Sequence, residues 1–221
     1  MCITVKQMMQ IEENGHQMGF LRKFMMENAG AATAKRIKEK YSGLWFQEDY
    51  KKILVFAGLG NNGGDGLVIA RHLAGYGSNV TVFLLGEADN IRSEECSWNW
   101  SVLEKMESIK LLTGGNLEDL NNLEFEIIID GILGTGISGE IREPQASAIT
   151  YINKSNAFKL AVDVPSGVDP DTGNKNSPHV TAGTTVTFHR MKVGMPKRKD
   201  VCGEIFVEKI GIPPEAEIGV L

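Results

Sequence analysis

Cysteine is scarce in this sequence, which holds only Cys2, Cys96 and Cys202 among its 221 residues. The three are far apart and odd in number, so neither a disulfide framework nor a zinc site is expected. Long apolar runs are also lacking, which excludes a membrane-spanning helix of ~18 residues. Basic residues do not prevail either: 23 Lys and Arg against 28 Asp and Glu give a net charge of −5. A non-specific nucleic-acid binder normally carries a strongly basic face, so nucleic acid is not an expected partner.

The N-terminus lacks the charged and apolar regions of a signal peptide, and the early acids Glu12 and Glu13 are untypical of a transit peptide. We therefore expect a cytoplasmic protein with no membrane partner. The apolar fraction of 42% is sufficient for a sizeable core. We expect a single domain over residues 1–221, with N-terminal helices over 4–42 and a core over 51–210.

Short apolar runs alternate with helical patterns through the middle of the chain. Several runs are apolar throughout, as in strands that are buried on both faces of a parallel sheet. The pattern predicts a three-layer α/β fold with a mainly parallel sheet. The expected strands are 53–57, 79–85, 109–112, 127–130, 160–163, 184–188 and 204–207, and the expected helices between them include 65–76 and 144–154.

A glycine-rich segment, residues 58–66 (GLGNNGGDG), follows the first expected strand and precedes a helix. Its G-x-G-x-x-G spacing is that of a dinucleotide-binding turn, and Glu87 lies after the next strand, where a ribose-binding acid would sit. Backbone amides at a helix start bind anions, so phosphate binding is favoured over a turn that binds nothing. Asn61, Asn62 and Asp65 add polar side chains that a dehydrogenase loop does not need.

Two further expected strands end on carboxylates, Asp130 and Asp163, each followed by a segment that contains glycine. In an open parallel sheet, ligands bind outside the carboxyl ends of the strands. One Asp alone could simply cap a turn. Three polar loops at the same edge predict a site.

Five motifs together resemble the NAD(P)H-hydrate epimerase family, and the resemblance covers nearly the whole chain in order. It implies an αβα Rossmann-like fold, commonly dimeric, that interconverts the R and S forms of hydrated NADH and NADPH. Many prokaryotic relatives carry this domain fused to an ADP-dependent hydrate dehydratase, which makes a dehydratase the implied functional partner. The motifs are MENAG at 26–30, GNNGGDG at 60–66, DGILGTG at 130–136, DVPSG at 163–167 and TFHRMKVG at 187–194.

The resemblance also implies a ligand set. A monovalent cation, potassium, is expected on Asn62, Asp130 and Ser166, whose oxygens suit a hard cation. Some relatives carry a lysine where this chain has Ser138, so no catalytic lysine is expected. The expected substrate-binding residues are Asn61, Asn62, Gly63, Gly64, Asp65, Gly134, Thr135, Gly136, Ile137, Ser138, Gly139, Glu140 and Asp163.

Asp130 is the expected catalytic residue. Loss of water from the hydrated ring, and its return from the other face, needs a group that moves protons, and a carboxylate at a strand end suits this role. Asp163 is the alternative acid, although we expect it mainly to bind substrate. Replacing Gly63 with Val is expected to weaken nucleotide binding while leaving the fold intact.

Two other functions remain open at this stage. The same fold could serve as a non-enzymatic nucleotide- or protein-binding module, against which the intact Asn62, Asp130 and Asp163 argue. An NAD(P)-dependent dehydrogenase would need a second substrate domain, for which 221 residues leave little room. A run of five basic residues fits a solvated loop or a basic rim for phosphate: Arg190, Lys192, Lys197, Arg198 and Lys199.

Overall fold

The computed structural model describes residues 2–40, 51–135 and 140–221. Its centre is a seven-stranded sheet with the order β3-β2-β1-β4-β5-β6-β7. Every pairing of neighbouring strands in this sheet is parallel, which confirms the expected α/β class with its parallel sheet. The strands are β1 Lys52–Ala57, β2 Asn79–Leu85, β3 Ile109–Gly114, β4 Ile127–Gly131, β5 Phe158–Val162, β6 Thr184–Phe188 and β7 Glu204–Glu208.

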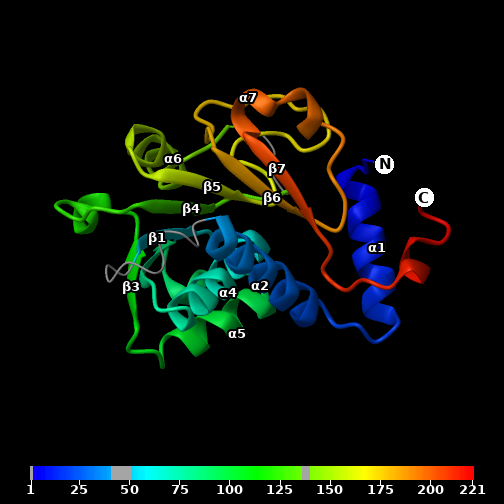
Figure 1. The fold of residues 1–221 in the computed structure, drawn as a ribbon, viewed down its shortest axis with the longest axis horizontal. Coiled ribbons are helices and arrows are strands. Elements are labelled where there is room, and N and C mark those ends of the chain that lie inside the picture. The colour runs from blue at the N-terminus through cyan, green and yellow to red at the C-terminus, as the bar shows by residue number, and fades with distance from the viewer. Residues whose placement is uncertain (1, 41–50, 136–139) are drawn as a thin grey trace.

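Helices cover both faces of the sheet. Figure 1 shows α2, α4 and α5 below the sheet and α6 and α7 above it. Neighbouring strand residues serve opposite layers: Val55 belongs to the core on the α4 side, whereas Phe56 packs against Tyr151 of α6. This is the period-2 alternation of a strand buried on both faces. The helices are α1 Val5–Gln17, α2 Arg22–Lys40, α4 Asn61–Gly75, α5 Glu94–Leu103, α6 Gln145–Lys154 and α7 Lys199–Cys202.

Helix α4 begins at Asn61, four residues before its expected start at residue 65. The glycines of the loop therefore form the first turn of the helix rather than a separate loop. A Cβ on Gly63 would lie 1.8 Å from the carbonyl oxygen of Gly58, so this turn packs directly on the backbone that leaves β1. Because glycine has a low helix propensity, the sequence predicted that the helix begins after the glycines. The close packing of this turn outweighs that propensity. The expectation that Gly63→Val leaves the fold intact is also wrong.

The MENAG motif joins α2 to α4. Glu27 pairs with Arg71 and His72 of α4, and Gly30 lies so close to Val68 that a Cβ would be 2.4 Å away. Asn28 donates a hydrogen bond to the carbonyl of Ile210 at 2.8 Å. The motif therefore holds the α2–α4 layer together.

Helix α1 lies beside the C-terminal segment, as Figure 1 shows in dark blue and red. Thr4 caps the helix in a capping box with Gln7. Asn14 donates to the carbonyl of Ala216 at 2.9 Å, and the Ile3 amide donates to the carbonyl of Met191 at 2.9 Å. These bonds fix α1 at the edge of the sheet where the strands end. No helix in the described ranges is long and apolar enough to cross a membrane.

Candidate active site

A cavity of about 480 Å³ lies at the carboxyl ends of the central strands. Its walls come from α1, α2, the first turn of α4, the start of α5 and the segments that follow β4, β5 and β6. This is the edge at which open parallel sheets bind ligands, and the volume suits a small molecule or part of a nucleotide. The predicted site residues that line it are Asn61, Asn62, Asp65, Gly134, Thr135 and Asp163.

Asp163 follows β5 with φ +63°, a conformation that residues other than glycine rarely adopt. The amide of Val164 donates to the carbonyl of Val162 at 2.8 Å, which closes a tight γ-turn around Asp163. Strain of this kind is often found at functional sites. Here the turn directs the carboxylate into the cavity.

One carboxylate oxygen of Asp163 is held by the protein and the other is not. Oδ1 accepts hydrogen bonds from the Thr187 hydroxyl at 2.9 Å, from the Phe188 amide at 3.2 Å and from the ammonium of Lys192. Oδ2 accepts none from any residue that the structure describes. A fixed carboxylate with one open oxygen is suited to contact a ligand.

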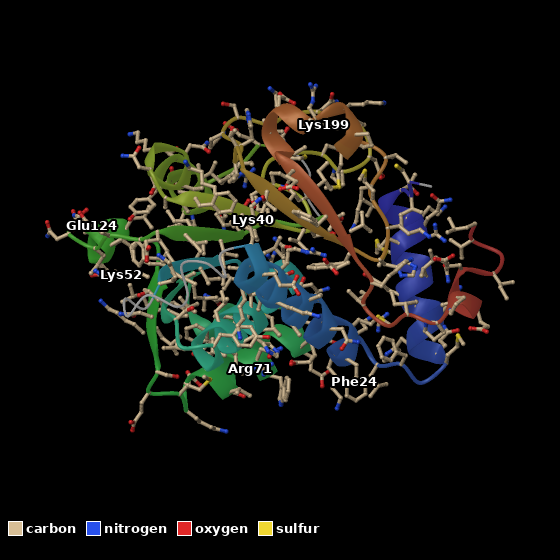
Figure 2. All side chains as sticks on the ribbon, in the orientation of Figure 1. Phe24, Lys40, Lys52, Arg71, Glu124 and Lys199 are labelled. Carbon is tan, nitrogen blue, oxygen red and sulfur yellow. The ribbon has the colours of Figure 1, made fainter. Side chains whose placement is uncertain are left out.

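Lys192 is 1% exposed and reaches the cavity from the segment after β6. Its ammonium group also donates to the Thr187 hydroxyl at 3.0 Å. It is therefore part of the site, not of a solvated loop. The rest of the basic run does not line the cavity: Arg190 pairs with Glu217, and Lys199 lies on the outer surface, where Figure 2 labels it.

Asp130 ends β4 behind the cavity wall and is 1% exposed. Its Oδ1 accepts from the Ser166 hydroxyl at 2.6 Å and the Ile132 amide at 3.2 Å, and its Oδ2 accepts from the Ser166 amide at 2.8 Å. Burial raises the pKa of Asp130 to about 6, and the bonds from Ser166 limit the rise. Asp130 does not line the cavity, in contrast to the position expected of a catalytic carboxylate.

Of the other two expected cation ligands, Ser166 is hydrogen-bonded to Asp130, and Asn62 packs on the segment that begins just after Asp130. A Cβ on Gly134 would be 3.2 Å from the Asn62 Cβ, and a Cβ on Gly131 would be 3.1 Å from the backbone oxygen of Asn62. The Asn62 amide is buried, and its Nδ2 has no hydrogen-bond partner among the residues that the structure describes. Because a turn of the amide exchanges nitrogen and oxygen, this position can present an oxygen instead.

These residues fit a hard monovalent cation. They offer one carboxylate, an amide and a hydroxyl, all oxygen donors. No cluster of three or more His, Cys, Asp or Glu side chains that could hold a metal ion occurs in the described part of the chain.

The first turn of α4 offers backbone amides to the cavity. Its N-cap, Gly60, lines the cavity and has no side chain that could cap those amides. A helix start of this kind binds phosphate. Gly63 and Gly64 do not line the cavity; they pack against Gly58 and Met26.

The loop after β4 is described only in part. Gly134 and Thr135 line the cavity, whereas Glu140 is exposed and does not. The expected binding residues Gly136, Ile137, Ser138 and Gly139 lie outside the described residues.

Two carboxyl groups in the cavity have raised pKa values. Burial, followed by the charge of Asp163, raises the pKa of Glu12 to about 7. Burial and the same neighbour raise the pKa of Asp65 well above its ordinary value. Perturbed carboxyl groups of this kind are typical of functional sites.

Sequence reasoning missed Glu12 as a site residue, because it comes from α1, which is remote in sequence from the strand-end loops. It named Lys192 only as part of a basic run, not as the partner of Asp163. Glu12 could have been found as an acid on the otherwise apolar face of α1. A second hollow of about 660 Å³, lined in part by Lys52 and Glu124, contains no expected site residue. Figure 2 labels both of these residues at the left edge of the molecule, where β1 begins.

Comparison with known proteins places the chain in a family. The chain is 62% identical to a protein named NAD(P)H-hydrate epimerase from Nitrosopumilus maritimus, and the match covers 99% of each chain. It is 61% identical to a protein of the same name from Cenarchaeum symbiosum over the full length of both. It is 44% identical to a bifunctional NAD(P)H-hydrate repair enzyme from Methanothermobacter thermautotrophicus, and the match covers 93% of this chain and 39% of that enzyme.

A solved structure is also similar. The crystal structure of the yeast protein YNL200c matches with a TM-score of 0.83 at 28% identity, over 98% of this chain and 91% of the yeast chain. The model of the family described as YjeF-related protein N-terminus matches residues 22–194. The chain therefore belongs to the YjeF-related protein N-terminus family.

Proposed function

We propose that this protein is an NAD(P)H-hydrate epimerase, which interconverts the R and S forms of hydrated NADH and NADPH. One observation carries the proposal: Asp163, with one open carboxylate oxygen, faces the same cavity as the uncapped start of α4. A proton-transferring group and a phosphate site therefore share one pocket. The names of the most similar full-length relatives support this reading.

The chemistry follows from the hydrated ring. Its C6 carries a hydroxyl group and adjoins the ring nitrogen, whose lone pair stabilises the cation left by the loss of water. Re-addition of water from the other face inverts the centre. Asp163 takes the proton from the incoming water, since the residue lines the cavity and its Oδ2 accepts no hydrogen bond from the described residues. Asp130, our first catalytic candidate, has both oxygens bound by the protein and is assigned instead to the cation site.

The nucleotide part of the substrate lies against the start of α4, where the amides after Gly60 bind phosphate. Arg22 and Arg92 line the cavity and add positive charge for the diphosphate. Asn61, Asp65, Gly134 and Thr135 line the same cavity.

We further propose that Asn62, Asp130 and Ser166 hold a potassium ion. Two observations support this: the Asn62 Nδ2 has no partner within the described ranges, and the Asp130 carboxylate is buried. When bound, the ion supplies positive charge behind the cavity wall, which favours the ionised form of Asp130 and attracts an anionic substrate.

Three wider expectations stay predictions: a homodimer, a cytoplasmic location and a hydrate dehydratase as functional partner. The dehydratase partner is supported by relatives named bifunctional NAD(P)H-hydrate repair enzyme. In three of them the match to this chain covers 39–43% of the enzyme's length.

The direct test starts from one purified epimer of hydrated NADH and follows the ratio of the two epimers. The wild type should bring it to equilibrium faster than buffer alone, and Asp163→Asn should lose most of this acceleration. Asp89→Asn, an exposed substitution of the same type, should behave as wild type. Binding without conversion would favour a non-enzymatic module, and a change in nicotinamide oxidation state would favour a dehydrogenase.

A further inference from the structure

Helix α1 presents a single ionisable group to the cavity. The α1 residues that line it are Val5, Met8, Met9 and Glu12. Their spacing of three and four places them on one face of the helix. The first three are apolar, so Glu12 is an isolated carboxyl group on a face that otherwise supplies hydrophobic contact. The whole of α1, including Glu12, lies before residues 22–194, the part matched by the family model.

Glu12 has no direct charge partner among the described residues. Its carboxyl group forms no hydrogen bond or ion pair with any residue that the structure describes. Its neighbour Glu13, in contrast, pairs with Arg22 and is 38% exposed. A half-buried carboxyl group without a partner is costly to keep in a fold unless it serves a ligand.

The charged groups that face Glu12 come from several elements. Asp163 after β5 raises its pKa, while Lys192 after β6 and Arg22 of α2 lower it. Asp65 of α4 interacts with Glu12, Asp163 and Lys192. Arg92, just before α5, and Glu95 in its first turn line the same cavity. Burial outweighs the two cations, so that the pKa of Glu12 rises to about 7. A proton donor works best when its pKa is close to the working pH.

We propose that Glu12 is the general acid of the epimerisation and acts together with Asp163 in the same cavity. This inference rests on the proposed function. In the forward step the protonated Glu12 gives its proton to the C6 hydroxyl, the C6–O bond breaks with its electron pair on oxygen, and water leaves. The lone pair of the ring nitrogen forms the C=N bond of the cation.

A second water then adds to C6 from the opposite face. Its oxygen forms the new C–O bond, the electron pair of the C=N bond returns to nitrogen, and Asp163 takes the proton. Transfer of that proton to the Glu12 carboxylate through solvent restores the starting state. Atoms and electrons balance without any co-reactant, and the reverse reaction uses the two carboxyl groups in exchanged roles.

Other groups in the cavity are less suited to this role. The ammonium of Lys192 is already bound to Asp163 and Thr187. Asp65 has a pKa well above its ordinary value, because burial and the carboxylates of Asp163 and Glu12 all disfavour its charge. Asp130 does not line the cavity. Glu12 combines an open carboxyl group with a position in the wall.

The test is Glu12→Gln, which keeps the shape of the side chain and removes its proton transfer. We expect kcat to fall about 100-fold while the Kd for the hydrate is unchanged within error. In the wild type, kcat should fall as pH rises through about 7, since the acid must be protonated. The variant should lack this decline. Glu39→Gln, which removes an exposed carboxylate of α2, should keep both the rate and the pH profile.

Glu12→Asp restores an ionisable group and should regain part of the rate and the decline with pH. The inference is overturned if Glu12→Gln turns over at the wild-type rate, or if its kcat falls but keeps the wild-type pH profile. Should the variant not fold, the wild-type profile decides, because a kcat that stays constant between about pH 6 and 8 excludes this acid. A wild type that does not epimerise at all rejects the proposed function instead.

Discussion

Asp163 and Lys192 form an ion pair in the cavity wall, although 29 residues separate them in the sequence. Lys192 is 1% exposed, so its charge is kept in the protein interior by this partner. A buried charge that loses its partner is strongly destabilising. The pair therefore fixes the end of β6 to the end of β5 and also holds the Asp163 carboxylate in place.

Lys192→Met should lower the free energy of unfolding by about 3–5 kcal/mol, since it leaves Asp163 unpaired. Urea unfolding measures this change. Lys199→Met, which removes an exposed lysine seven residues later, should change stability by less than about 0.5 kcal/mol. When Asp163 is already replaced by Asn, Lys192→Met should lower the free energy of unfolding by less. Equal losses of unfolding free energy with and without Asp163→Asn would mean that the two residues are not coupled.

Gly60 and Gly63 make a matched pair within one turn. Gly63→Ala should cost about 3 kcal/mol of stability, because its Cβ would meet the backbone oxygen of Gly58 at 1.8 Å. Gly60→Ala should fold normally, since nothing lies within 4 Å of its Cβ. As Gly60 lines the cavity, the second variant should nevertheless bind the hydrated nucleotide more weakly. Calorimetric titration checks this, and wild-type affinity in Gly60→Ala would move the phosphate away from the start of α4.

Glu12→Gln should raise stability at neutral and alkaline pH by about 1–3 kcal/mol. The ordinary pKa of 4.5 is raised to about 7 in the fold, so the native state retains a proton that the unfolded chain has released. Wild-type stability therefore falls as pH rises from 4.5 to 7 because of this group. The advantage of the variant should be absent near pH 4, grow through this range and stay constant above it. A difference that does not vary with pH would refute the raised pKa.

Potassium should stabilise the wild type relative to a bulky organic cation. A gain of about 1 kcal/mol corresponds to a Tm rise of about 2–4 °C in a chain of this size. Asn62→Ala should abolish the difference, whereas Asn61→Ala, at the exposed neighbouring position, should keep it. The same Tm in both salts for the wild type would argue against a cation on Asn62, Asp130 and Ser166.

The sheet could be predicted from the sequence because its strands are short, several of them are almost wholly apolar, and helical patterns separate them. Residues 79–85 and 184–188 were predicted at their observed bounds. The start of α4 could not be predicted in the same way, because glycines disfavour a helix in isolation. Only the contact between Gly63 and Gly58 explains why glycine is needed in this turn. Local propensity carries no information about such a contact.

The site was predictable in position but not in the roles of its acids. Asp130 is the penultimate residue of a buried strand, β4, and Asp163 directly follows another, β5. Sequence alone could not show that Asp130 lies behind the wall while Asp163 lines the cavity. The γ-turn at Asp163, with φ +63°, makes this difference. Glu12 enters the site only because α1 is fixed across the strand ends by long-range bonds such as Asn14 to Ala216.

The most direct test of the account is epimerisation by the wild-type protein in water enriched in oxygen-18. Starting from one pure epimer of hydrated NADH, mass spectrometry follows the label in the inverted product. Loss of water and re-addition from the opposite face predict that each newly inverted molecule carries one labelled oxygen. Inverted product that retains the original oxygen, or no acceleration over buffer, would contradict it.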